Sequence, residues 1–160
     1  MLAQYRKLIS LSLTSVDLPL QSTLETIATL HRKDAERFHL VLKQPPFPDR
    51  LPHQPQTALN GNQNDGLLWL ELSAHRVIMT MQGQGKLGYR HCWEKDSDGT
   101  SRYWLQDETL DAANSLHLKN FTRRLQLSGD LLPDRLHLEY ELYSGKMQLG
   151  QYILNLHIQH

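Results

Sequence analysis

The last part of the chain alternates apolar and polar residues, and this pattern limits its fold more than any other feature. The segment reads LHLEYELYSGKMQLGQYILNLHI, in which leucine and tyrosine recur at every second position over most of its length. A period of two places successive side chains on opposite faces of a β-strand, so the segment predicts two half-buried strands. Ser144-Gly145 between them indicates a two-residue hairpin turn.

The alternation shifts by one residue at Gly150. Strict pairing from a turn at Ser144-Gly145 would place Leu138 opposite Gln151, which does not suit a core face. One extra residue at Gly150-Gln151, a β-bulge, restores an apolar pair between Leu138 and Tyr152. A similar change of phase at positions 119–120 predicts a second bulge. Bulges in long strands indicate a strongly curved sheet.

The first third of the chain predicts two strands and a helix. KLISLSLT, residues 7–14, alternates as a half-buried strand does. In STLETIATLHRK, Ser22 and Glu25 have the spacing of a capping box, and apolar residues follow at helical spacing. This pattern predicts an amphipathic helix over residues 22–36. RFHLVLK, residues 37–43, alternates again and predicts a second strand.

From residue 67 onward, short alternating segments are separated by tight turns, which indicates an antiparallel meander. We therefore predict a mainly β fold, of the α+β type only through its one N-terminal amphipathic helix. Its core is a barrel-like antiparallel sheet of about eight to ten strands. In strand number and meander order over residues 67–160, this arrangement resembles the calycin group, which includes lipocalins and fatty-acid-binding proteins. The pattern leaves open whether the sheet closes.

Residues 44–66 differ from the rest because they hold five of the seven prolines and show no periodicity. A connection of this kind is typical of a lid, a binding loop or a disordered segment, and all three remain open. The length of 160 residues suits a single domain spanning 1–160.

Charge and composition exclude several classes of protein. The formal net charge is zero, whereas binding to nucleic acid normally needs a basic surplus. No stretch has the length and hydrophobicity of a membrane span, and the N-terminus lacks the apolar core of a signal peptide, so we expect a soluble cytoplasmic protein. The sequence contains no phosphate loop, dinucleotide fingerprint or nucleophile elbow, and no cofactor is predicted.

Nine histidines raise the question of a metal site. A strand presents two imidazoles on one face through His-x-His, and the sequence has no such pair. His117, His137 and His157 each lie on the polar phase of a predicted strand and would cluster only if those strands were neighbours. No metal site is predicted.

The most suggestive residues are aromatic. Tyr89, His91 and Trp93 share one face of LGYRHCWE, and Tyr103 lies on the strand that returns after the next turn. Rings combined with a few polar groups inside a barrel are typical of a small-molecule pocket. They are equally typical of a filled barrel core. These residues are the candidate ligand-binding site.

Two functions follow, and both are hypotheses. Because no catalytic motif is present, we expect a non-catalytic interaction or accessory module of the assembly type, whose partner is another protein and which acts through the sheet face or residues 44–66. The alternative is a carrier or lyase-like protein that holds a small hydrophobic or aromatic ligand inside the barrel. An enzyme whose residues converge only in space is the third reading.

Overall fold

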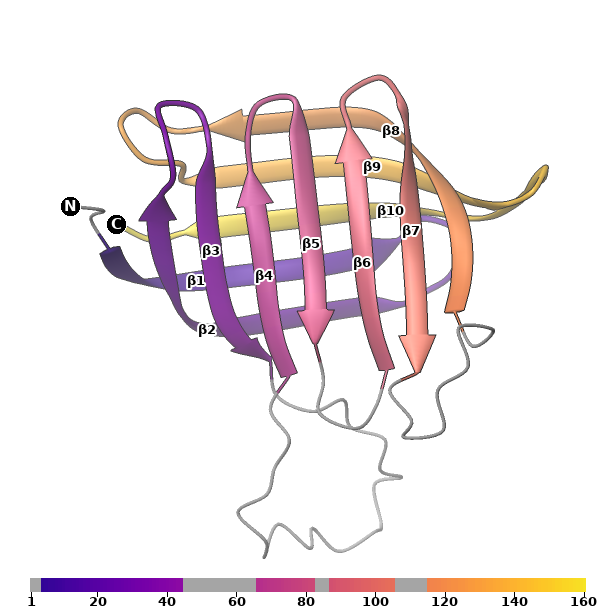
Figure 1. Cartoon of the computed structure of the whole chain (residues 1–160), viewed down its shortest axis with the longest axis horizontal. Coiled ribbons are helices and arrows are strands. Elements are labelled where there is room, and N and C mark those ends of the chain that lie inside the picture. Colours follow the sequence, from indigo (N-terminus) through magenta and orange to yellow (C-terminus); the bar gives the residue numbers. More distant parts are fainter. Residues whose placement is uncertain (1–3, 45–65, 83–86, 106–114) are drawn as a thin grey trace, which may run out of the picture.

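The computed structural model describes residues 4–44, 66–82, 87–105 and 115–160, and every helix or strand among them is a β-strand (Figure 1). The ten strands are β1 (Gln4–Ser15), β2 (Gln21–Arg32), β3 (Phe38–Gln44), β4 (Gly66–Leu72), β5 (Arg76–Gln82), β6 (Leu87–Glu94), β7 (Asp98–Leu105), β8 (Ser115–Ser128), β9 (Arg135–Ser144) and β10 (Met147–Ile158). Within this part of the chain, no helix is long and apolar enough to cross a membrane.

The strands form a closed antiparallel barrel. Each strand pairs with its neighbours in the chain, and β1 pairs with β10 to complete the circle, for example through Ile9 opposite Ile158. This arrangement confirms the predicted mainly β, barrel-like antiparallel meander and gives the upper end of the predicted strand number. The barrel is flattened, and β3 to β7 run across β1, β9 and β10, which lie behind them in Figure 1. The long strands β2 and β8 curve from one layer to the other.

The predicted helix over residues 22–36 is wrong, because most of this segment is strand β2. β2 pairs with β1 along its whole length and with β3 at its end, so the backbone groups that a helix would satisfy internally are satisfied by two neighbours. Ala28 and Leu30 point into the core, while Ile27 is 54% exposed on the outer face. The segment contains several β-branched residues, and these suit a pleated sheet better than a helix.

Both predicted bulges exist, but their positions and one register differ. The β9–β10 ladder shifts between Gln148 and Gly150, yet the turn residues are Gly145 and Lys146, with Gly145 at φ +60°. Leu138 therefore lies opposite Leu154 and not Tyr152. Hydrophobicity alone did not reveal this offset of two residues, because a shift by two keeps every side chain on its face.

The second bulge lies between Thr122 and Arg124 in β8, and not at positions 119–120. The expected position was wrong because Asn120 and Thr122, which are polar, occupy inward positions and are fully buried. Phe121 is only partly buried because it points away from the core. The polar residues in the interior thus concealed the true phase of the strand.

The interior is lined by two chemically different groups of residues. Leucines from six strands fill one part almost completely, each at most 1% exposed: Leu30, Leu40, Leu70, Leu72, Leu138 and Leu154 among them. The other part is built from tyrosine, tryptophan, histidine and small polar residues on β6 to β10. This contrast directs attention to the aromatic part as the place where a ligand could be recognised.

Candidate ligand site in the barrel interior

The four residues singled out in the sequence meet inside the barrel, on the neighbouring strands β6 and β7. The imidazole of His91 stacks on the indole of Trp93, with ring centroids 4.8 Å apart and planes inclined by 4°. Tyr103 approaches His91 edge-on at 5.4 Å, and Tyr89 lies 6.0 Å from Tyr103. The predicted cluster therefore exists as a structure, while its role in binding stays a prediction.

Two further tyrosines complete the cluster from other strands. Tyr140 of β9 lies 4.9 Å from Trp93 and 6.1 Å from His91, measured between ring centroids. Tyr152 of β10 stacks on Tyr140 at 5.4 Å. Their inward phase could be read from the alternation in each strand, but their approach to β6 depends on closure of the barrel. The sequence offered no signal for that approach.

A chain of hydrogen bonds connects this cluster to β8. The Asn120 amide nitrogen donates to the carbonyl oxygen of Cys92 at 3.2 Å and to the Ser101 hydroxyl oxygen at 2.9 Å. The Ser101 oxygen lies 2.6 Å from Nδ1 of His91, and the Tyr103 hydroxyl lies 3.3 Å from Nε2. In neutral His91 one ring nitrogen donates and the other accepts, so the imidazole links the hydroxyl groups of Ser101 and Tyr103.

Burial keeps these groups uncharged near neutral pH. It lowers the pKa of His91 to about 4, so the imidazole is neutral. It raises the pKa of Tyr89 and of Tyr103 to about 12, and it raises the pKa of Tyr140 further. The site therefore presents hydrogen-bonding groups without a formal charge.

Three buried polar atoms in this region have no hydrogen-bond partner among the residues that the structure describes. They are Nε1 of Trp93, Oδ1 of Asn120 and Oγ1 of Thr122, and each belongs to a residue with 0% exposed surface. The indole offers a donor, the amide oxygen an acceptor, and the hydroxyl can do either. Buried polar groups are nearly always paired, so three unpaired atoms around one set of rings call for a physical reason.

Burial differs within the cluster. Tyr89, Tyr103 and Tyr152 are only partly buried, although the strand alternation directs them inward, whereas Trp93 and His91 are 0% and 4% exposed.

The histidines on the polar face do not form a three-residue cluster. β8, β9 and β10 are neighbours, but His137 lies opposite Gln126, while His117 is nine residues back along β8, about 30 Å away. His137 and His157 line one shallow outer groove of about 430 Å³, where Nδ1 of His137 lies 2.6 Å from Oδ1 of Asn155. The residues with assigned positions contain no group of three or more potential metal ligands.

Comparison with known proteins supports the fold and leaves the chemistry open. No family model and no curated protein matches the sequence. The crystal structure of the ywiB protein from Bacillus subtilis is similar, with a TM-score of 0.65 and 12% sequence identity. The match covers 99% of this chain and 96% of that one, so the whole barrel is shared. An identity this low shows a common fold and carries no statement about function.

Proposed function

We propose that this barrel is a carrier for a small, uncharged ligand with an aromatic or apolar body, bound next to the aromatic residues of the interior. The observation that supports the proposal is the set of unpaired buried atoms on Trp93, Asn120 and Thr122, next to the tyrosine rings. A ligand with one acceptor and one donor would pair them and remove the cost of leaving them unsatisfied.

The chemistry of the site limits the ligand. The inward residues here are His91, Ser101, Asn120, Thr122 and the aromatic rings, and His91 is neutral above about pH 4. A charged ligand would lose its hydration without gaining a counter-charge, which is strongly unfavourable. Rings stacked at 4.8 to 5.4 Å favour a flat ligand that adds a further aromatic contact. A carbonyl acceptor suits the indole N–H and the Tyr103 hydroxyl.

The direct test is native mass spectrometry of gently purified protein, with an absorbance spectrum of the same sample. We expect a mass above 18.6 kDa that returns to 18.6 kDa on denaturation, together with a loss of thermal stability when the bound molecule is removed. A bare chain that no neutral aromatic compound stabilises would contradict the proposal.

A matched pair of variants locates the site. Tyr103→Phe removes the hydroxyl beside His91 and should weaken ligand binding by about tenfold, since one hydrogen bond of about 1.4 kcal/mol is lost. Tyr5→Phe makes the same change on a tyrosine that is 37% exposed and should have no effect. Equal affinity in both variants would place the ligand elsewhere.

The first expectation from the sequence, a protein-interaction or accessory module, stays a prediction. It is compatible with a ligand inside the barrel, because an interaction would use the outward side chains of the same strands. The lyase-like version of the carrier also stays a prediction, since it needs a reacting group on the ligand that has not been identified.

A further inference from the structure

We propose that the outer face of β3 to β8 binds an acidic peptide segment of a partner protein. The proposal concerns outward side chains and does not depend on a ligand inside the barrel. Its centre is a row of residues that lie directly opposite one another on successive strands, here called the Trp69 row: Val41, Trp69, Thr80, Arg90, Arg102 and His117. At about 4.8 Å per strand, the row is about 24 Å long.

The charge of the Trp69 row is unbalanced. Arg90 and Arg102 are exposed and lie directly opposite each other, an arrangement that destabilises a sheet when it is left uncompensated. The guanidinium of Arg102 lies 5.4 Å from the ring centroid of Trp104, which fixes its direction on this face. Within the described residues, neither arginine is paired with a carboxylate. A carboxylate between them would accept hydrogen bonds from both and relieve the repulsion.

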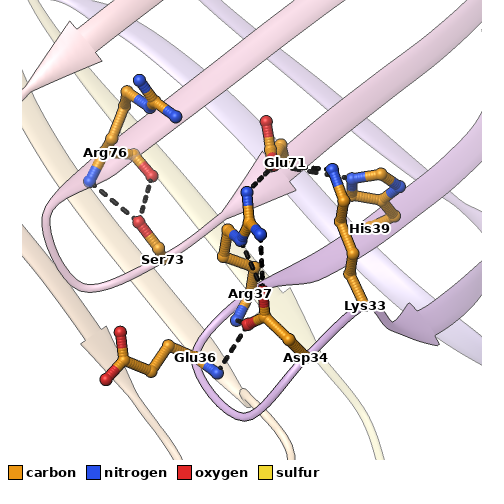
Figure 2. Close-up of polar contacts among 8 residues, drawn as sticks. All are labelled: Lys33, Asp34, Glu36, Arg37, His39, Glu71, Ser73 and Arg76. Carbon is orange, nitrogen blue, oxygen red and sulfur yellow. Dashed lines mark hydrogen bonds and ion pairs between the residues drawn. The ribbon is translucent and has the colours of Figure 1, made fainter.

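Glu71, an acid on the same face, is already occupied. Glu71 lies one row away, and its carboxylate oxygen is 3.5 Å from Nζ of Lys33, 3.8 Å from Arg37 and 3.7 Å from Nε2 of His39 (Figure 2). Partial burial opposes ionisation of this carboxyl, but the attraction of Lys33 and His39 outweighs it and lowers the pKa of Glu71. Glu71 therefore stays ionised and is paired with Lys33 and Arg37, so it does not balance the charge of the two arginines of the Trp69 row.

The same face has a groove that is lined in part by apolar side chains. A groove of about 670 Å³ crosses β2 to β6 and is lined by Trp69, Val41 and Ile78 together with the cationic Arg90 and Lys33. The Trp69 side chain is 44% exposed, which is unusual for an indole in a sheet. Tryptophan and arginine are the residues most enriched where protein interfaces gain their affinity. The apolar surface around Trp69 and the neighbouring pair of arginines fit a peptide that has one bulky side chain followed by carboxylates.

A single-stranded nucleic acid would also use an exposed ring and cations. It is disfavoured because the chain as a whole has no net positive charge, whereas a short acidic peptide needs only the local cations. The choice of an acidic peptide therefore rests on the contrast between the local charge and the total charge.

The test uses the full chain and three probes measured by calorimetry. One is a short acetylated and amidated peptide in which Asp and Glu surround a central Phe. The second has Asn and Gln in place of the acids, and the third is a short oligothymidylate. We expect the acidic peptide to bind best, with an affinity that falls as salt is raised.

Variants assign the binding to the Trp69 row. The double variant Arg90→Gln/Arg102→Gln should weaken the acidic peptide by at least about tenfold. Trp69→Ala should weaken the acidic and the amide peptide alike. Arg135→Gln removes an exposed arginine from the opposite layer, at the start of β9, and should bind like the unchanged protein. Thermal unfolding of the double variant should occur at an unchanged or higher temperature, because a repulsion has been removed.

Three results would overturn the proposal. The amide peptide could bind as well as the acidic one, the double variant could retain full affinity, or the oligothymidylate could bind more tightly than either peptide. A lower unfolding temperature of the double variant would likewise show that the two arginines stabilise the sheet, and so remove the argument from their repulsion.

Discussion

At the scale of single residues, the interior polar groups decide what this barrel can do. Buried hydroxyl groups nearly always have a hydrogen-bond partner, yet the fully buried Thr122 hydroxyl has none within the described part of the chain. His91 is the opposite case, since its ring nitrogens contact Ser101 and Tyr103. Thr122 therefore allows a test of the free-energy cost of an unpaired hydroxyl, and His91 allows a test of the role of a buried, hydrogen-bonded imidazole.

Thr122→Val replaces the unpaired hydroxyl with a methyl group of nearly the same shape. We expect the ligand-free protein to become more stable by about 1 kcal/mol, because no hydrogen bond is lost and the cost of burying the hydroxyl disappears. Ligand affinity should fall in the same variant. Urea unfolding and ligand titration measure the two effects. Thr100→Val, at an exposed position of β7, is the control and should change stability by less than about 0.5 kcal/mol. A destabilised Thr122→Val protein would show that the hydroxyl has a partner.

The stability of the protein should fall in mild acid because of His91. Its pKa is about 4 when folded and near 6.5 when unfolded, so the unfolded state binds more protons between these values. The free energy of unfolding therefore decreases as the pH falls through this window, by up to about 3 kcal/mol in total. Unfolding curves from pH 7 to pH 4, compared with those of His91→Asn, isolate the contribution. Parallel pH profiles for the two proteins would rule it out.

At the scale of elements, the close approach of strands at glycines has a testable consequence. A Cβ added to Gly99 in β7 would lie 2.0 Å from the carbonyl oxygen of Cys92 and 2.7 Å from Oδ1 of Asn120. The first neighbour is backbone and cannot move without disturbing the β6–β7 ladder. Gly99 thus allows Asn120 to donate to both Cys92 and Ser101.

Gly99→Ala should therefore destabilise the protein by about 3 kcal/mol, and it should also displace Asn120 from the hydrogen-bond chain. Gly145→Asn is the control, because nothing lies within 4 Å of an added Cβ there and asparagine tolerates the φ of +60°. It should cost about 1 kcal/mol or less. Thermal unfolding measures both variants, and equal losses would mean that the clash at Gly99 is relieved by a small shift of the strands.

At the scale of the whole molecule, closure of the barrel is the dominant fact. Pairing of β1 with β10 leaves no free edge, so the chain avoids the association that an open sheet of this length invites. Closure also brings the start of β1 beside the end of β10 (Figure 1). Continuing the register in which Ile9 faces Ile158 places Lys7 beside His160, which leaves about 10 Å to the beginning of β1 at Gln4.

A circular permutant should consequently fold. We would join the two ends of this chain with a short Gly-Ser linker and open it at the Gly145-Lys146 turn. Every strand keeps both of its partners, so the circular dichroism spectrum should match that of the unpermuted chain and the unfolding transition should stay cooperative. A permutant that lacks a cooperative transition would show that the β9–β10 hairpin must be continuous for the barrel to form.

Sequence alone determined the local elements and the inward face of most strands, because an alternation of period two is a property of neighbouring residues. It correctly predicted a curved antiparallel meander, and it selected Tyr89, His91, Trp93 and Tyr103, which the structure does bring together. It failed for β2, where apolar residues fit both a helix and a strand, and pairing on two sides decided the outcome. A local sequence pattern carries no information about which strands lie on either side of a segment.

Tertiary structure alone decided the features that join distant parts of the chain. Closure through β1 and β10, the approach of Tyr140 to Trp93, and the contact of Asn120 with Ser101 all connect segments whose separation in sequence conceals their proximity. The pairing of Arg90 with Arg102 also depends on the tertiary structure. A shift of the strand register by two residues would keep both side chains on the outer face and would still separate them. Hydrophobic pattern selects a face, whereas hydrogen-bond register selects the partner, and only the folded barrel sets the register.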